Sequence, residues 1–330
     1  MENNILTIRK EGLYCEAGDF YVDPRGRVER AIITHAHSDH ARAGHRNYLC
    51  SDPCKALLQV RIGQKSPIES IPFGQEQLIG EARVSFHPAG HILGSAQIRI
   101  EVGGYVWVVS GDYKPQSDKT CETFELVSCH GFISECTFGL PVYKWQPEGE
   151  IHHQINHWWE KNKTDGLGSL LFAYSLGKAQ RVLAGLDPSI GPIYAHSAVH
   201  SFLDHYKNAG VVLPDVKKVD KEKDFTGAMV IAPPAVEDSS WTKKFRQVKR
   251  GFASGWMAIR GPRRRKNLDR GFVLSDHADW TGLIDVITGT GAETVKVTHG
   301  NGDALSRFLQ EKGVNASVLN ESSFRGEELD

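Results

Sequence analysis

Residues 33–45, ITHAHSDHARAGH, hold four histidines and one aspartate within thirteen positions. Histidine is the commonest metal ligand in proteins, and neutral imidazole together with carboxylate suits zinc and similar divalent ions. In an extended chain alternate side chains point the same way, so His35 and His37 can converge on one ion. Asp39 and His40 follow where the chain bends and are placed to reach a second ion. A capped polar helix start is the alternative, but this spacing favours a metal-binding loop.

The elements around this loop predict how it is held. Residues 30–33, RAII, form a short apolar run with β-branched members, which predicts a buried strand that ends at the loop. Residues 40–49 are expected to begin a helix. Catalytic zinc needs ligands from several segments and an open position for water, so further ligands must come from elsewhere in the chain.

Three further segments each place one ligand-type residue at the end of an apolar, β-rich run. His91 lies between two such runs, Asp112 ends YVWVVSGDY, and His299 ends TVKVTHGN. Each of them has a nearby glycine, which lets the backbone turn tightly, and these glycines are Gly90, Gly111 and Gly300. Taken singly, each is more often a turn residue than a ligand, but their recurrence at strand ends favours one shared site.

The order of these motifs resembles the metallo-β-lactamase fold. HAHSDH, AGHILGSA and SGDY occur in that family's order, which implies an α/β protein built as an αββα sandwich with metals at one edge of its two sheets. SECTFG (134–139), YSLGKAQRVLAGL (174–186), LSDHADW (274–280) and VTHGN (297–301) are similar to the nucleic-acid-processing β-CASP branch. Within this branch the chain resembles bacterial ligase-associated DNA exonucleases over nearly its whole length.

The resemblance implies a role for each ligand-type residue. It implies two divalent ions, zinc with manganese as the alternative, of which the first is held by His35, His37 and His91, the second by Asp39, His40 and His299, with Asp112 bridging them. Asp39 and Asp112 thereby also count as catalytic residues. Two metals in such a site can generate a nucleophile and stabilise both oxygens of an in-line displacement at phosphorus.

Three further residues gain roles from the resemblance. Asp23 matches an aspartate that orients the metal loop, although an Asp-Pro turn explains it equally well. Glu135 is expected to hold His277, which would donate a proton to the leaving oxygen. The alternatives are a surface carboxylate at a strand end and a polar residue at a helix start. Asp276 stands where the family usually has Ser or Ala, and its charge would favour a protonated His277.

An inserted domain is expected in the middle of the chain. Residues 141–268 are expected to form a smaller α/β cap domain of the β-CASP type, between metallo-β-lactamase segments 1–140 and 269–330. Within it, EGEIHHQINHWWEKN (148–162) is amphipathic at helical spacing. His153 and His157 lie four apart, but without the Glu of a His-Glu-x-x-His site or a third ligand they are interpreted as ordinary polar residues.

The cap also carries candidate nucleic-acid contacts. Gly177 opens a predicted helix whose first N–H groups can receive a phosphate. Residues 241–270 contain eleven Lys and Arg residues and one acidic residue, with aromatic residues interleaved. Such a stretch fits a groove that tracks a nucleic-acid strand, and a solvated basic face is the alternative. The expected contacts are Lys178, Arg181, Trp256, Arg263, Arg264, Arg265 and Lys266.

The composition limits the class of protein. The chain has 330 residues, 40% of them hydrophobic, and a net charge of −1, so the total charge neither requires nor excludes an acidic partner. No stretch approaches a membrane span, the N-terminus lacks a signal-peptide layout, and six cysteines do not suggest a disulfide scaffold. A cytoplasmic location is therefore expected.

The function expected from the resemblance is a metal-dependent DNA exonuclease of DNA repair. It would use metal-bound hydroxide as nucleophile and act on single-stranded DNA or strand ends, in a pathway with a DNA ligase and a helicase. An RNA-processing nuclease of the same branch is one alternative. A small-molecule metallo-hydrolase and a non-enzymatic binding protein are the others, although the complete ligand set disfavours the last.

Overall fold

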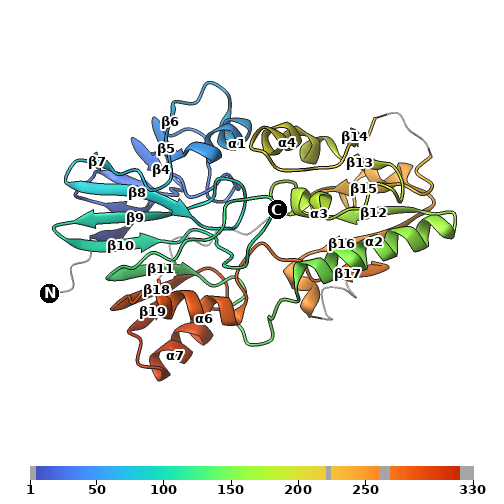
Figure 1. Ribbon diagram of the computed structural model, residues 1–330. Coiled ribbons are helices and arrows are strands. Elements are labelled where there is room, and N and C mark those ends of the chain that lie inside the picture. The colour runs from blue at the N-terminus through green and yellow to red at the C-terminus, as the bar shows by residue number, and fades with distance from the viewer. Residues whose placement is uncertain (1–4, 221–223, 260–267, 320–330) are drawn as a thin grey trace. The chain divides into compact units, whose positions relative to one another are not determined.

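The computed structural model describes residues 5–220, 224–259 and 268–319 (Figure 1). The chain divides into two compact units. The discontinuous unit comprises Met1–Pro141 and His277–Leu329, and the inserted unit comprises Val142–Asp276. The second boundary lies at Asp276 rather than at residue 268, because strand β17 (Arg270–Phe272) pairs with the sheet of the inserted unit. The two units are described separately below.

The discontinuous unit contains two sheets. The first has six strands in the order β1-β2-β3-β4-β5-β6. They are β1 (Leu6–Arg9), β2 (Gly12–Cys15), β3 (Phe20–Val22), β4 (Arg30–Ile32), β5 (Asn47–Ser51) and β6 (Ile68–Ile71). Strands β3 to β6 are parallel, whereas β1 and β2 pair antiparallel. Helix α1 (Asp52–Ile62) follows β5 and packs on this sheet.

The second sheet of this unit has seven strands in the order β19-β18-β11-β10-β9-β8-β7. They are β7 (Gln77–Ile79), β8 (Ala82–Pro88), β9 (Ala96–Val102), β10 (Tyr105–Val109), β11 (Gly131–Glu135), β18 (Thr294–Thr298) and β19 (Ala316–Val318). Strands β10, β11 and β18 are parallel neighbours. Helices α6 (Trp280–Gly289) and α7 (Gly302–Glu311) lie on the outer face of this sheet (Figure 1).

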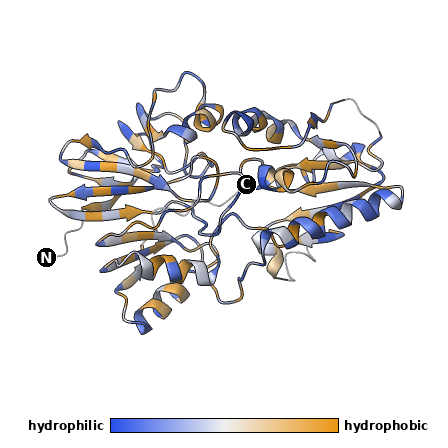
Figure 2. Cartoon of the chain, in the orientation of Figure 1, coloured by the Kyte–Doolittle hydropathy of each residue, from blue (hydrophilic) through white to orange (hydrophobic). Residues whose placement is uncertain are grey.

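The two sheets of the discontinuous unit pack face to face. Ile32 and Leu49 of the first sheet share one buried cluster with Phe86 and Ile98 of the second. The alternate residues of the second sheet, such as Val108 of β10, point to the other face and pack against α6 and α7. This division follows from the alternation of side chains along a strand. Figure 2 shows hydrophobic and hydrophilic residues alternating along β8 and β9. The unit is therefore layered as helix, sheet, sheet and helices.

The inserted unit is built on a parallel six-stranded sheet in the order β14-β13-β15-β12-β16-β17. Its further strands are β12 (Gly168–Phe172), β13 (Ile193–Ala195), β14 (Val216–Lys218), β15 (Met229–Ala232) and β16 (Val248–Ala253). Its helices are α2 (Glu148–Thr164), α3 (Lys178–Ala184) and α4 (Ser197–Asn208), with short 3-10 turns η1 (Pro234–Val236), η2 (Ser240–Lys244) and η3 (Gly255–Ala258). Ile155 and Trp159 of α2 share a buried cluster with side chains of α3, α4 and one sheet face.

The structure confirms the α/β class that the sequence predicted. The strand predicted at residues 30–33 is present as β4, and the apolar runs beside His91, Asp112 and His299 are present as β8, β9, β10 and β18. The prediction that a helix begins within residues 40–49 was wrong. This segment is a loop followed by β5, because the backbone of β5 pairs with β4 on one side and β6 on the other. Within the described ranges, no helix combines the length and apolar character that a membrane crossing requires.

Candidate metal centre

The candidate site lies where several strands of the discontinuous unit end. Because β8, β10, β11 and β18 run in the same direction, their carboxyl ends meet at one edge of their sheet. His91, Asp112, Glu135 and His299 lie at or just beyond these ends. The histidine-rich loop of the first sheet begins directly after β4 and reaches the same place. Short loops on parallel strands thus bring together residues that are far apart in sequence.

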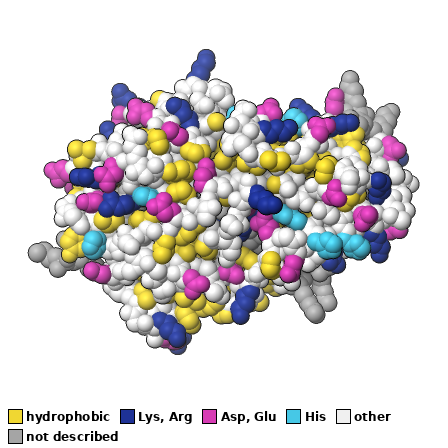
Figure 3. All heavy atoms as spheres, viewed as in Figure 1, with side chains coloured by type: hydrophobic (Ala, Val, Ile, Leu, Met, Phe, Trp, Pro, Cys, Tyr) yellow, Lys and Arg dark blue, Asp and Glu magenta, His cyan; other side chains and the backbone are white. Residues whose placement is uncertain are grey.

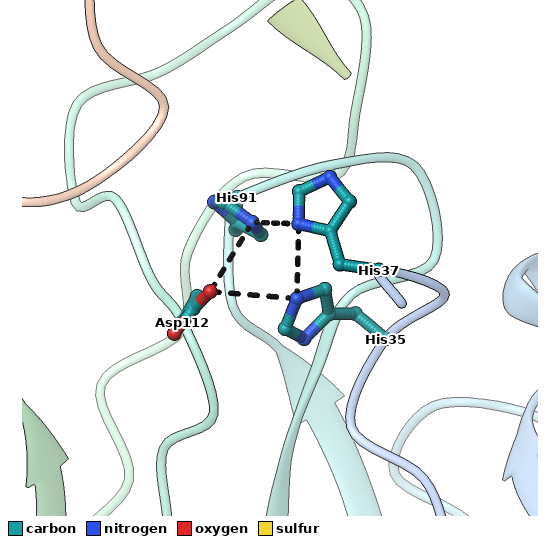
Figure 4. A group of neighbouring side chains, drawn as sticks. All are labelled: His35, His37, His91 and Asp112. Atoms are coloured by element: carbon teal, nitrogen blue, oxygen red, sulfur yellow. Dashed lines mark hydrogen bonds and ion pairs between the residues drawn. The ribbon is translucent and has the colours of Figure 1, made fainter. Parts of the chain in front are cut away.

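Four donors form the first donor group, which consists of His35, His37, His91 and Asp112. The Nε2 atoms of His35 and His91 lie 3.2 and 3.1 Å from Nδ1 of His37. They lie 3.4 and 3.7 Å from Oδ2 of Asp112. All four side chains point toward one centre (Figure 4).

The spacing of the first donor group fits a tetrahedral ion. Ligand atoms that lie 2.0–2.1 Å from a tetrahedrally coordinated zinc are about 3.3–3.4 Å from one another. The four donor–donor distances of this group bracket that value. Three imidazole nitrogens and one carboxylate oxygen are also the donor types that zinc takes in catalytic sites. The buried cluster can therefore hold a divalent metal.

Three residues form a second donor group, which consists of His40, Asp112 and His299. Nε2 of His40 lies 3.6 Å from Oδ2 of Asp112. This is the same oxygen that faces the first donor group, so Asp112 belongs to both groups. Asp39 lies at the rim, with its side chain 58% exposed and Oδ2 3.5 Å from Nε2 of His40.

Asp23 and Thr34 hold the loop in place. One Asp23 oxygen accepts the Thr34 N–H at 2.8 Å, and the other accepts the Thr34 hydroxyl at 2.6 Å and contacts Nδ1 of His40 at 2.7 Å. The Thr34 hydroxyl also lies 3.0 Å from Nδ1 of His35. The contacts of His35 and His40 occupy Nδ1 of each ring and leave Nε2 to face the donor groups. Thr34 was not among the predicted site residues, although its place directly before the first histidine was a signal.

Charges within the cluster shift the pKa values of its members. Burial opposes the charged form of His40, but Asp39, Asp112 and Asp23 outweigh it and raise the His40 pKa well above its ordinary value. Burial likewise opposes ionisation of Asp112, yet His40 and His277 hold its pKa well below the usual range. The Asp39 pKa falls to about 2, because the attraction of His40 and other loop histidines exceeds the cost of burial and the repulsion of Asp112. The cluster is thus a set of strongly interacting charges.

Glu135 and His277 form a pair beside the donor groups. Nδ1 of His277 lies 2.9 Å from both carboxylate oxygens of Glu135. The Tyr113 N–H donates to one of these oxygens at 2.8 Å, which fixes the carboxylate at the end of β11. The His277 ring lies 4.6 Å from the His91 ring between centroids, and Nε2 takes no part in the pair with Glu135. A proton on Nδ1 is therefore held by Glu135, whatever the state of Nε2.

The residues predicted to contact nucleic acid differ in their burial and in whether the structure describes them. Lys178 and Arg181 are 3% and 1% exposed and have partners within the inserted unit, which argues against direct contact with a phosphate. Trp256 is partly buried in η3, with its ring 5.8 Å from that of Tyr143. The other predicted contacts, Arg263, Arg264, Arg265 and Lys266, lie outside the described residues. Figure 3 shows basic and acidic side chains interspersed on the face in view.

His153 and His157 lie on α2 and line an open, polar cavity of about 620 Å³ in the inserted unit. Across the described ranges, no group of three metal-binding side chains includes either of them.

Comparison with known proteins identifies relatives over most of the chain. A protein of Opitutus terrae named probable DNA ligase is 32% identical over 314 residues, which cover 94% of this chain and 31% of that protein. Endoribonuclease YSH1 of Mycosarcoma maydis is 27% identical, covering 55% of this chain and 24% of that protein. Transcription termination factor FttA of Methanosarcina mazei is 29% identical, covering 57% of this chain and 37% of that protein. No model of a known protein family matches the chain.

The fold also has a counterpart among solved structures. A protein of unknown function from Enterococcus faecalis has a TM-score of 0.62 and 13% identity, covering 90% of this chain and 80% of that one. This likeness concerns the fold alone. The structure is thus that of an α/β protein with a buried His/Asp cluster that can bind metal. These relatives are consistent with the resemblance to the β-CASP branch of the metallo-β-lactamase family that the motifs imply. The chain spans between 24% and 37% of the length of the three sequence relatives.

Proposed function

We propose that the chain is a metal-dependent nuclease that hydrolyses phosphodiester bonds of DNA as an exonuclease. In this proposal the discontinuous unit is the metallo-β-lactamase sandwich and the inserted unit is the β-CASP cap. The single observation that carries it is the placement of two donor groups around one oxygen of Asp112, with the Glu135–His277 pair beside them. A lactamase-type or thioesterase-type hydrolase would not need that pair.

The donor groups are proposed to hold two divalent ions, with zinc favoured and manganese as the alternative. His35, His37 and His91 would hold the first ion, His40, His299 and Asp39 the second, and Asp112 would bridge them. Such ions, when bound, activate water and neutralise the charge that develops on a phosphate. Asp23 would keep the loop and His40 oriented through its contacts with Thr34 and with Nδ1 of His40.

His277 is proposed as the general acid. Its Nδ1 proton is held between the two oxygens of Glu135, so Nε2 is the nitrogen that can give a proton to the leaving oxygen. A deoxyribose alkoxide is a poor leaving group, and a histidine near neutral pH is a suitable acid for it. Glu135 stabilises the protonated ring before transfer, since its carboxylate is buried and fixed by the Tyr113 N–H.

The experiment is hydrolysis of single-stranded DNA labelled at its 5′ end, with zinc or manganese added to the purified chain. Immediate release of labelled mononucleotide is the expected result and would define attack from the 5′ end, whereas a shrinking labelled ladder would define attack from the 3′ end. His277→Ala is expected to lose at least about a hundredfold in rate. Full activity of this variant on DNA would overturn the assignment of the acid.

RNA is the second candidate substrate. Relatives named endoribonuclease and transcription termination factor cover more than half of this chain, so RNA of the same sequence belongs in the same assay. Cleavage of RNA with DNA left intact would replace the DNA proposal. Inertness toward both polymers would point to a small-molecule substrate for the same donor groups.

DNA repair is the proposed setting. The relative from Opitutus terrae is named a probable DNA ligase, and the part similar to this chain makes up 31% of it. If a nuclease-like segment and a ligase were joined in one polypeptide, the nuclease would trim DNA ends that the ligase then seals. We therefore include a DNA ligase, and with it a helicase, as proposed partners of this chain.

A further inference from the structure

Two basic side chains of α3 are buried in the inserted unit. Lys178 is 3% exposed and Arg181 is 1% exposed. A buried charge is stable only where it is paired and hydrogen-bonded, because removing an ion from water costs several kcal/mol even after relaxation. The positions of their partners therefore indicate what these two residues do.

Both side chains hold the two residues that precede His277. Nζ of Lys178 lies 2.7 Å from Oδ1 of Asp276, whose side chain is 2% exposed. Nη1 of Arg181 donates to the Ser275 carbonyl oxygen at 2.6 Å. One helical turn of α3 thus anchors both a side chain and a backbone carbonyl of this segment.

The start of α3 is itself fixed. The Gly177 N–H donates to Oε1 of Gln180 at 2.7 Å, and Nε2 of Gln180 donates to the Ser175 carbonyl at 3.1 Å. Nζ of Lys178 also lies 4.7 Å from the centre of the Tyr174 ring, within the range of a cation–π contact. The anchor for residues 275 and 276 is therefore a closed and well-packed turn.

The residues after His277 are held in the discontinuous unit. The Ala278 N–H donates to the Tyr113 carbonyl at 2.7 Å, and Asp279 caps α6 by accepting the Gly282 N–H at 2.9 Å. The backbone around His277 is thus restrained on both sides, and its ring is restrained by Glu135. Loss of the preceding anchor would free one side of this segment.

We propose that Lys178 and Asp276 are positioning residues that set the orientation of His277. This inference rests on the proposed role of His277 as general acid. It gives a reason for Asp276, which departs from the usual Ser or Ala of the family, and it replaces the phosphate contact predicted for Lys178. Because the Asp276 carboxylate pairs with Lys178, Glu135 is the carboxylate that holds the His277 proton.

The test compares two substrates that differ in the need for an acid. Cleavage of DNA has a sugar alkoxide as leaving group, which must be protonated. Hydrolysis of the p-nitrophenyl ester of thymidine 5′-phosphate instead releases p-nitrophenolate, which is stable without a proton. Asp276→Asn and Lys178→Met are expected to lower kcat on DNA at least tenfold with KM unchanged, and to change kcat on the aryl ester less than twofold. His277→Asn should show the same pattern more strongly. An equal loss on both substrates would mean a structural role and would overturn the proposal.

Two further variants keep this test decisive. The double variant Lys178→Met with Asp276→Asn leaves no unpaired buried charge, so it is expected to fold even if a single variant does not. Its loss on DNA should match that of one single variant, because the pair acts as a unit. Arg83→Met breaks the exposed 3.0 Å ion pair with Glu76 and should leave both rates unchanged.

A spectroscopic measurement separates this inference from the proposed activity. A proton on Nδ1 of His277 that is shared with a carboxylate is expected to give a downfield proton resonance, which His277→Asn removes. Loss or broadening of that resonance in Asp276→Asn and Lys178→Met would support the positioning role even if the wild-type chain cleaved neither substrate. An unchanged resonance in the folded double variant would overturn it.

Discussion

A single carboxylate oxygen organises the candidate metal centre. Oδ2 of Asp112 lies 3.4, 3.7 and 3.6 Å from Nε2 of His35, His91 and His40. Without an ion, protonated imidazole is what balances this buried negative charge, which explains the opposite pKa shifts of Asp112 and His40. If both donor groups held ions as proposed, Asp112 would be the residue that the two sites share.

Binding of an ion should therefore release a proton from His40. Its raised pKa favours the protonated form of His40, whereas a metal can bind only the neutral ring. Zinc binding at pH 7 is expected to release about one proton from this residue, and its affinity should rise with pH until the raised pKa is passed. Calorimetry in buffers of different ionisation enthalpy measures the number released.

Asp23→Asn provides the matched variant for this measurement. It removes one of the carboxylates that raise the His40 pKa while keeping a similar shape, so fewer protons should be released. Glu29→Gln, which removes an exposed partner of Arg46, should release as many as the wild type. Heats that do not depend on the buffer would contradict the charged state assigned to His40.

Ligand-type residues were predictable because their sequence context was simple. His91, Asp112 and His299 each follow an apolar run, and the strands predicted from those runs are present. The partners of Lys178 were not predictable, since no local pattern shows that a helix start will meet Asp276, ninety-eight positions later, in the folded unit. Tertiary packing decides that Lys178 is buried. The residues next to it in sequence suggest only that a helix start could bind a phosphate.

At the scale of elements, the turn after β18 stores backbone strain at the candidate site. His299 has φ +62° and Gly300 has φ +60°, so two successive residues adopt the left-handed region. A histidine there costs roughly 1–2 kcal/mol, a cost that is tolerated where the conformation serves a site. A Cβ on Gly300 would overlap the Cys136 carbonyl oxygen, so this turn requires glycine.

Gly300→Ala is expected to destabilise the fold more than Gly291→Ala. Gly291 has φ +69° but open space where the Cβ of an alanine would lie, so alanine there incurs only the left-handed penalty of about 1 kcal/mol. Gly300→Ala adds the overlap with Cys136 and should lose at least about 2 kcal/mol in urea-induced unfolding. Equal losses in the two variants would show that the turn adapts to a side chain.

At the scale of the whole molecule, the boundary between the two units was predicted less well than the strands near the candidate site. Residues 270–272 fall within the expected last metallo-β-lactamase segment, 269–330, yet as strand β17 they pair with β16 at the edge of the parallel sheet. Three residues of extended chain carry no sign of the sheet they will join, because either edge offers the same backbone partners. The boundary therefore became visible only through the pairing in the structure.

All residues of both donor groups belong to the discontinuous unit, whereas the inserted unit has its own sheet and core. Removal of metal by a chelator is therefore expected to speed amide hydrogen exchange in residues 34–40, 90–92, 111–113 and 298–300, where ligation would oppose local opening. Strands β12 and β15 at the centre of the inserted sheet should keep their protection.

His35→Ala should show the faster amide exchange even without chelator, and addition of the chelator should change its exchange rates little. Equal acceleration in β12 and β15 would mean that metal binding stabilises the inserted unit as well, and independent cores would then be the wrong description of this chain.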